Sequence, residues 1–325
     1  MITMAELLSM GELLIDFTPS GYTEGGQLLF ARNPGGAPAN VAVQAARAGV
    51  SAGFLGRVGD DLFGNFLAET LSGCGVETRG LTLDPDYATT LAFVQLTETG
   101  DRDFSFYRNP GADTRLDFDS VDCSLLDECR LLAFGSLLLT AEPSCTAVER
   151  LVDYARSRGK LTAYDPNWRP PLWKDWELGV RRMRSLVPKA DVMKVSEEEL
   201  ALLTEKPTLK EGAAELLAQG VSIVVATLGP KGCAAFTPGF SLELPTYDTQ
   251  VRDTTGSGDS FFGALLAKLV QSGKHPRELT RDELLEFLDF ANAAGAVCAT
   301  KSGAIPALPD LDAIEVCRRT VPLLR

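Results

Sequence analysis

The chain has 325 residues, of which 45% are hydrophobic and 23% charged, a composition typical of a globular protein with a large core. Its net charge of −13 argues against nucleic acid or an anionic membrane as a partner. An anionic substrate must therefore be held by local positive groups rather than by the field of the whole protein.

Three features of the sequence indicate where the protein is located in the cell and which kinds of catalytic site it lacks. They are the cysteines, the single histidine and the N-terminus. The seven cysteines are scattered without a Cys-x-x-Cys pair, which favours a reducing, cytoplasmic location. The single histidine, His275, argues against a Ser-His-Asp triad and a histidine-rich metal site. The N-terminus lacks the basic segment of a signal peptide, and no apolar run approaches the ~18 residues of a membrane span.

Short apolar strands alternate with helical segments along most of the chain. The predicted strands are 7–11, 52–59, 130–136, 160–165, 190–196 and 221–229. Helices are predicted over 38–49, with Pro38 in the first turn and Gly49 at the end, and over 64–75. This alternation predicts a single α/β domain over residues 1–325, with a mostly parallel sheet flanked by helices.

Several polar residues follow these strands directly. In parallel sheets, ligands bind beyond the carboxyl ends of the strands. The residues expected at this edge are Asp165, Ser196, Thr227 and Asp253.

Two segments, about 13–36 and 87–111, interrupt the alternation. Each has strand-like patterning and turns rich in glycine or aspartate, with no helix between its strands. The second is expected to form a hairpin that turns at 98–101. We expect the two segments to form a small antiparallel β lid beside the main sheet.

The clearest chemical signal is DTTGSGDSFF, residues 253–262. Gly256 and Gly258 predict a loop that opens onto a helix, and such a junction attracts anions through free backbone N–H groups and the helix dipole. Asp259 is unexpected there, unless it only caps the helix. Phosphoryl transfer to a hydroxyl accounts for both features, because the phosphate needs N–H donors and the hydroxyl needs a base. The chain contains neither G-x-x-x-x-G-K-[ST] nor G-x-G-x-x-G.

This motif resembles the C-terminal signature of the ribokinase-like carbohydrate kinases, the PfkB family, whose form is DT(T/V)G(A/S)GD. Residues 35–49 and 56–64 resemble the family's N-terminal signature, so the resemblance covers essentially the whole chain. It implies a ribokinase-like, doubly wound fold and an ATP- and Mg²⁺-dependent sugar kinase. It also implies that Asp259 is the catalytic base and that Gly256, Ser257 and Gly258 form an anion hole.

Within the family, several segments resemble fructokinases: 11–19, 90–96, 104–113, 164–173 and 194–204. This resemblance implies transfer of the γ-phosphoryl group of ATP to the C6 hydroxyl of D-fructose. One alternative is a 2-keto-3-deoxygluconate kinase, whose substrate carboxylate needs a further cation such as Arg169. Another is a sugar-binding regulator that has lost catalysis on the same fold.

The resemblance also assigns binding roles. On the sugar side it implies Asp16, Gly35, Gly36, Asn40 and Arg108, with Arg169 as a further candidate. On the nucleotide side it implies Thr227, Gly229, Gly232 and, near adenine, Asn292.

The same resemblance implies two cation sites. Glu199 would organise Mg²⁺ through water, although Ser196 stands where many members have asparagine. A monovalent site for K⁺ would be formed by Asp253 with Cys298, Lys301 and Gly303. Ala307 stands where such sites often have a serine, which weakens this second assignment. A lid sheet in this family can also mediate a homodimer.

Overall fold

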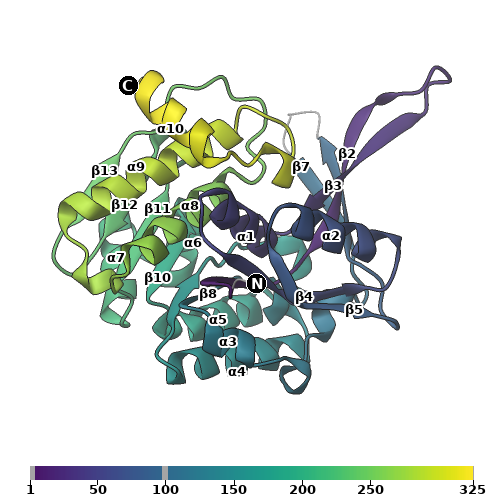
Figure 1. The fold of residues 1–325 in the computed structure, drawn as a ribbon, viewed down its shortest axis with the longest axis horizontal. Coiled ribbons are helices and arrows are strands. Elements are labelled where there is room, and N and C mark those ends of the chain that lie inside the picture. Colours follow the sequence, from purple (N-terminus) through teal and green to yellow (C-terminus); the bar gives the residue numbers. More distant parts are fainter. Residues whose placement is uncertain (1–3, 97–101, 325) are drawn as a thin grey trace.

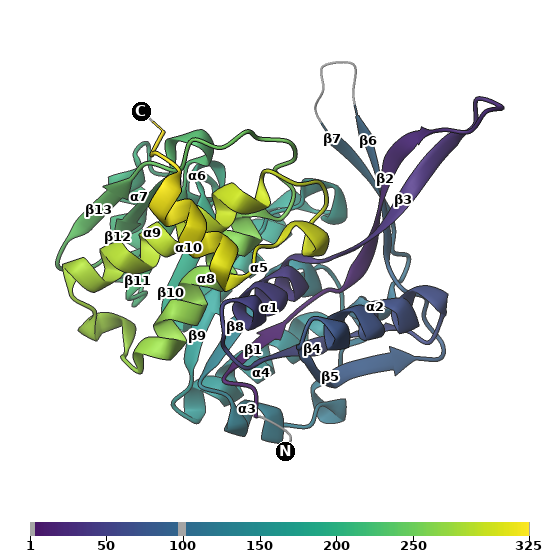
Figure 2. The same ribbon diagram turned by 45° about the horizontal axis from the view of Figure 1, so that its top comes forward.

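The computed structural model describes residues 4–96 and 102–324, which form two sheets (Figure 1). The larger sheet lies between two layers of helices. The smaller one rises from the body at one side, as two hairpins (Figure 2).

The larger sheet is mostly parallel. In spatial order its strands are β13 (Ser241–Leu244), β12 (Cys233–Phe236), β11 (Ile223–Thr227), β10 (Val192–Ser196), β9 (Leu161–Tyr164), β8 (Leu131–Phe134), β1 (Leu7–Met10), β4 (Ala52–Gly59) and β5 (Glu77–Asp84). The pairs from β11 to β5 are parallel, whereas β12 and β13 are antiparallel to their neighbours. From β1 the chain continues to β4 and β5 on one side and later to β8 on the other. The order thus reverses at β1, and a ligand site is expected at the carboxyl ends there.

Helices cover both faces of this sheet (Figure 1). On one face lie α1 (Ala37–Arg47), α2 (Leu62–Gly73), α8 (Ser257–Ser272), α9 (Arg281–Cys298) and α10 (Leu311–Thr320). On the other lie α3 (Ser124–Glu128), α4 (Ser144–Ser157), α5 (Trp176–Leu186), α6 (Glu197–Thr204) and α7 (Leu209–Ala218). Successive residues of a strand point to opposite faces, so Leu7 packs in the first layer and Leu8 in the second.

Short 3₁₀ helices occupy several connections. They are η1 (Ala112–Arg115), η2 (Phe118–Ser120), η3 (Leu137–Thr140), η4 (Pro170–Leu172), η5 (Val187–Lys189), η6 (Gly229–Lys231), η7 (Pro276–Glu278) and η8 (Ile305–Ala307).

The smaller sheet is the predicted lid. Its strands, in spatial order, are β3 (Leu28–Gly35), β2 (Leu14–Tyr22), β6 (Leu91–Leu96) and β7 (Arg102–Tyr107). The two outer pairs are antiparallel, and the middle pair, β2 with β6, is parallel. The turn predicted at 98–101 lies outside the described residues.

The predicted strands and helices of the main body are all present, with ends shifted by a few residues. Three strands were not predicted: β5, β12 and β13. Two of them are only four residues long. Strands β12 and β13 follow β11 without an α-helix between them, so they lie outside the alternation from which the other strands were predicted.

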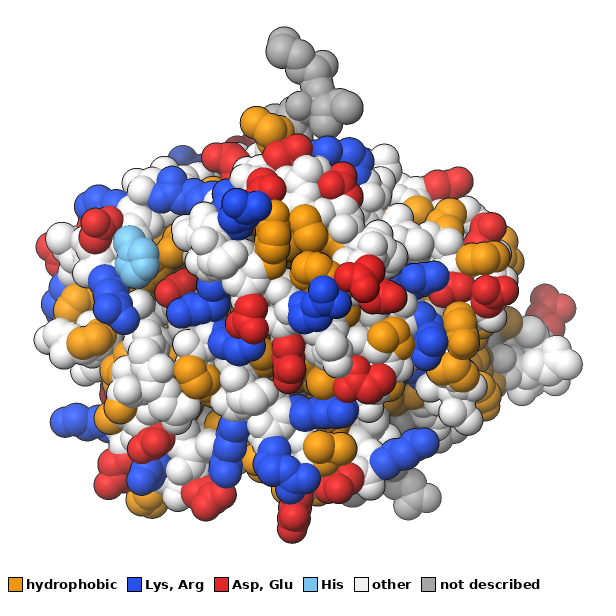
Figure 3. Space-filling model, turned by 90° about the horizontal axis from the view of Figure 1, so that it is seen from below, with side chains coloured by type: hydrophobic (Ala, Val, Ile, Leu, Met, Phe, Trp, Pro, Cys, Tyr) orange, Lys and Arg blue, Asp and Glu red, His pale blue; other side chains and the backbone are white. Residues whose placement is uncertain are grey.

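The surface described carries charges of both signs. On the face shown in Figure 3, lysine and arginine side chains are interspersed with aspartate and glutamate. Among residues 4–96 and 102–324, no helix has the length and hydropathy needed to cross a membrane. All seven cysteines are free thiols.

Candidate active site

A cavity of about 920 Å³ opens beyond the carboxyl end of β1, where the strand order reverses. Eight residues predicted for the site line it: Asp16, Gly36, Asn40, Arg169, Glu199, Gly256, Gly258 and Asp259. They come from the lid, from α1, from the segment after β9, and from α6 and α8. The fold therefore brings together most of the sugar-side and catalytic residues.

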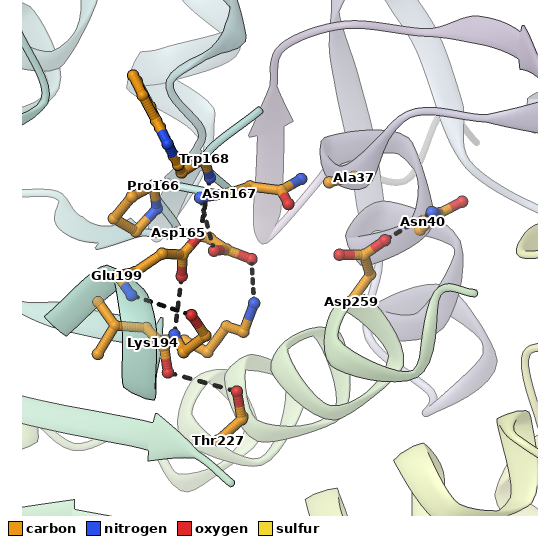
Figure 4. A network of polar contacts seen from close by, with 12 residues as sticks. Ala37, Asn40, Asp165, Pro166, Asn167, Trp168, Lys194, Glu199, Thr227 and Asp259 are labelled. Carbon is orange, nitrogen blue, oxygen red and sulfur yellow. Dashed lines mark hydrogen bonds and ion pairs between the residues drawn. The ribbon is translucent and has the colours of Figure 1, made fainter. Parts of the chain in front are cut away.

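Asp259 lies in the first turn of α8, whose N-cap, Gly256, has a left-handed φ of 77°. The Asn40 amide donates a hydrogen bond of 2.7 Å to Oδ2 of Asp259 (Figure 4). Asn40 is buried and Asp259 lines the cavity, so this contact fixes one oxygen of a carboxylate that borders the cavity. No side chain caps α8, and the first N–H groups of a helix have no partner within it. The N–H of Ser257 has a partner outside the helix, because it donates to the Thr254 carbonyl.

A second cavity, of about 540 Å³, lies on the other side of the glycine loop. All four residues predicted for the nucleotide line it: Thr227, Gly229, Gly232 and Asn292. Thr254 and Gly258 line both cavities. The start of α8 is therefore the boundary across which the two cavities meet.

The two glycines at the base of the lid are required by close packing. Gly36 has a φ of 111°, and a Cβ there would lie 2.4 Å from the Glu12 carbonyl oxygen. A Cβ on Gly35 would lie 2.2 Å from Oδ2 of Asp16. The turn thus allows β3 to pass against the Asp16 carboxylate and lead directly into α1, which carries Asn40.

Arg108 has a different environment from the one predicted. Its side chain is 5% exposed and forms an ion pair of 2.6 Å with Asp113. It also donates to Thr140 and to the Leu137 carbonyl. In the described part of the chain it lines neither cavity. These contacts attach the end of β7 to the body, and an Arg108 bond to a sugar would have to displace them.

Glu199 is held on the cavity wall by backbone groups. Its Oε1 accepts from the Trp168 N–H and its Oε2 from the Ser196 N–H, both at 2.7 Å (Figure 4). Ser196 in turn caps α6 by accepting from the Glu199 N–H. Each carboxylate oxygen keeps a further lone pair, so Glu199 fits a role in orienting the waters of Mg²⁺, and that role stays a prediction.

The predicted monovalent-cation residues lie together near the glycine loop. Asp253 accepts from the N–H groups of Thr255 and Gly303, at 2.8 and 3.1 Å. The Cys298 carbonyl accepts from the N–H of Lys301. Within residues 4–96 and 102–324, no group of three or more His, Cys, Asp or Glu side chains is arranged to hold a metal. K⁺ binding here stays a prediction.

Two buried ionisable features of the site were not assigned a role from sequence: Glu12, and the pair of Lys194 with Asp165. The Lys194 ammonium lies 2.8 Å from Oδ2 of Asp165, and both side chains are buried. Glu12 is 2% exposed and accepts from the Ala37 N–H, at the start of α1.

Glu12 should make stability depend on pH. Burial raises the pKa of Glu12 to about 8 from 4.5; Asp113 adds to the rise, and backbone N–H groups oppose it. The folded state therefore keeps a proton that the unfolded chain releases, and the associated stability is lost as pH rises from about 4.5 to about 8.

We therefore expect Glu12→Gln, a neutral isostere, to match the wild type near pH 4.5 and to exceed it by on the order of a few kcal/mol above pH 8. Urea unfolding of both proteins across this range measures the difference, with the exposed Glu24→Gln as control. If the two proteins differ in free energy of unfolding by the same amount at every pH, the raised pKa of Glu12 is contradicted.

Comparisons with known proteins identify the family of the chain. The sequence profile of the family described as "pfkB family carbohydrate kinase" matches residues 4–311. A curated relative, probable fructokinase-3 of Arabidopsis thaliana, is 42% identical over 95% of this chain and 90% of its own length. A crystal structure of fructokinase from Xylella fastidiosa with bound ATP has a TM-score of 0.89 and 31% identity, and covers 96% of this chain and 98% of that one.

A second similar structure is a double mutant of the fructokinase from Vibrio cholerae O395, with fructose, ADP and potassium bound. Its TM-score is 0.87 at 31% identity, with 97% of this chain and 98% of that one covered. The chain belongs to the pfkB family of carbohydrate kinases. It is therefore a sugar kinase, and the predicted ribokinase-like fold is confirmed.

Proposed function

We propose that this kinase transfers the γ-phosphoryl group of ATP to the C6 hydroxyl of D-fructose. The observation that carries the proposal is the place of Asp259, at the boundary of the two cavities and beside the first N–H groups of α8. A hydroxyl in the larger cavity would meet the Asp259 carboxylate, which accepts its proton. A phosphoryl group arriving from the smaller cavity would meet the N–H groups, which stabilise its charge.

Each remaining component has a part in this reaction. Glu199 would help to hold Mg²⁺, and the ion would supply positive charge to offset that of the phosphates. Glu199 would orient its waters. Asn40 holds the Asp259 carboxylate through the 2.7 Å bond, so that one oxygen stays directed at the hydroxyl. Gly256 and Gly258 allow the backbone to approach the phosphoryl group closely.

Support for fructose comes from the character of the cavity and from the relatives. A neutral sugar needs hydrogen-bond partners for its hydroxyls, and Asp16 and Asn40 both line the cavity. The similar Vibrio protein was solved with fructose and ADP, and the similar Xylella protein with ATP.

A keto acid is the substrate to test against fructose. Arg169 lines the cavity with an exposed side chain, and its one hydrogen-bond acceptor among the described residues is the Trp168 carbonyl. It is therefore accessible to a substrate carboxylate such as that of 2-keto-3-deoxygluconate. A catalytically silent sugar-binding regulator is disfavoured by the intact Gly256, Gly258 and Asp259.

Release of ADP over a panel of sugars decides between these substrates. We expect kcat/KM to be highest for fructose, compared with ribose and 2-keto-3-deoxygluconate. A tenfold preference for the keto acid, about 1.4 kcal/mol in transition-state binding, would reject the fructose assignment if Arg169→Ala abolished that preference. Reactions without protein and with Asp259→Asn serve as controls.

Two further expectations concern the protein in the cell. The scattered free thiols support a cytoplasmic location. The lid supports a homodimer contact, because it carries the exposed side chains of Tyr22, Leu28, Leu29 and Tyr107.

A further inference from the structure

The two cavities contain very few positive charges for a site that must hold a triphosphate. In the described residues, their acidic lining side chains are Glu12, Asp16, Glu198, Glu199, Asp248 and Asp259. Among the same lining residues the cations are Arg169, which is exposed, and Lys194, which is 7% exposed. Lys194 is therefore the buried cation available to a phosphate group in these cavities, within the part of the chain described.

Lys194 is an unusual residue for its strand. It belongs to β10, in which Met193 and Val195 are fully buried apolar residues. Its ammonium group has three N–H donors, and in the described residues one acceptor, Oδ2 of Asp165, lies within bonding distance at 2.8 Å. The other Asp165 oxygen accepts from the Asn167 N–H. Two donors of Lys194 thus remain for a ligand.

The ammonium group lies beside the start of α8. A Cβ placed on Gly258 would be 3.4 Å from Nζ of Lys194. In Figure 4 the side chain reaches up to Asp165 on the side of the network that faces Asp259. Lys194 lines the larger cavity but not the nucleotide cavity. It is therefore placed where the cavities meet, on the acceptor side.

The charge of this group is maintained by its neighbours. Burial lowers the pKa of Lys194, but the carboxylates of Asp165, Glu199 and Asp259 outweigh burial and raise it above the ordinary value. Removing a lysine and an aspartate from water is energetically costly, so a buried pair alone gives little net stability. A pair at this position is better explained if the lysine has a second, anionic partner during the reaction.

We propose that Lys194, oriented by Asp165, binds the phosphoryl group in transit between the two cavities. In the donor complex it contacts the γ-phosphate of ATP, and in the product complex the same group as a sugar phosphate. Because Lys194 lies on the acceptor side of Gly258, it does not contact the α- and β-phosphates. The inference depends on phosphoryl transfer across this boundary and not on which sugar is the acceptor.

Calorimetric titration of ATP and ADP, with Mg²⁺ and without sugar, tests the proposal. We expect Lys194→Met to weaken ATP binding about 10- to 100-fold, the loss typical of one or two charge-assisted hydrogen bonds, and to change ADP binding less than about threefold. Equal losses for ATP and ADP, or no loss for ATP, would overturn it.

Two further variants separate phosphate binding from a purely structural role. Lys194→Met leaves Asp165 without its partner, so the double variant Asp165→Asn/Lys194→Met removes both charges and restores neutrality. We expect the double variant to bind ATP as weakly as the single one. If its affinity for ATP recovers to within about threefold of the wild type, Lys194 serves only to neutralise Asp165. The matched control is Lys189→Met, which removes a Lys–Asp pair of the same 2.8 Å length outside the cavities and should leave ATP binding unchanged.

These titrations contain no sugar. If the sugar panel rejects fructose, the difference between ATP and ADP is still expected. If the panel supports fructose but Lys194→Met weakens ATP and ADP binding equally, the proposed role of Lys194 is rejected and the proposed function stands.

Discussion

The variant Asp259→Asn is expected to lower kcat/KM about 10²- to 10⁴-fold, the effect typical of losing a general base. The asparagine keeps the shape of the side chain and can still pair with the Asn40 amide through its oxygen. It cannot accept the proton of the sugar hydroxyl. The binding of fructose and ADP, measured by calorimetry, should therefore stay within a few-fold of the wild type.

The matched control is Asp282→Asn, because Asp282 is also a first-turn aspartate, on α9, and is exposed. Both variants lose one favourable charge at a helix N-terminus, a contribution of about 0.3–1 kcal/mol to stability. Only Asp259→Asn should lose turnover. Retention of more than about half the wild-type rate by Asp259→Asn would remove the carboxylate from its catalytic role.

The second large effect is expected from Asp16→Ala, which should raise the KM for fructose about 10- to 100-fold. A carboxylate that accepts sugar hydroxyls forms charge-assisted hydrogen bonds, each worth about 1.5–3 kcal/mol. Asp16 lines the larger cavity and not the nucleotide cavity, so the KM for ATP should change less than about threefold. Initial rates over a grid of both substrates give the two constants.

Asp16 also belongs to the lid, so its loss could act by loosening β2. Asn33 is the control, because it is paired with Asp16 in the β2–β3 register and donates to Thr18 across the two strands. It does not line the larger cavity. Asn33→Ala should therefore disturb the lid without raising the fructose KM selectively. A parallel rise of both KM values in Asp16→Ala would show that the carboxylate is not a sugar ligand.

The sequence was informative where neighbouring residues determine the structure. The alternation of strands and helices, the glycine loop and the two irregular segments of the lid are local patterns, and each corresponds to an element of the structure. Strands β12 and β13 escaped prediction because they lie outside the alternation of strands and helices and gain their order from antiparallel pairing at the sheet edge. The parallel pairing of β2 with β6 joins segments that are far apart in the sequence, so local patterns did not indicate it.

In the site, too, residues of a continuous motif could be predicted, whereas residues that depend on distant partners could not. Asp259 and Gly256 were identified from one continuous motif. Arg108 was expected to face the sugar, but its ion pair is with Asp113, which belongs to η1 beyond the end of the lid. Lys194 was missed because its role depends on Asp165, 29 residues away in sequence. The signal available was a lysine within the apolar run of β10, since lysine is almost never fully buried without a partner.

The boundary formed by Thr254 and Gly258 has a stereochemical consequence. In the proposed reaction, donor and acceptor approach this boundary from opposite sides, so the phosphoryl group would cross it in a single in-line displacement. Such a displacement inverts the configuration at phosphorus and forms no phosphorylated enzyme. Both substrates must then be present on the protein at once, and the kinetics are sequential rather than ping-pong. With a γ-phosphoryl group made chiral by oxygen isotopes, the sugar phosphate is therefore expected to carry the inverted configuration at phosphorus.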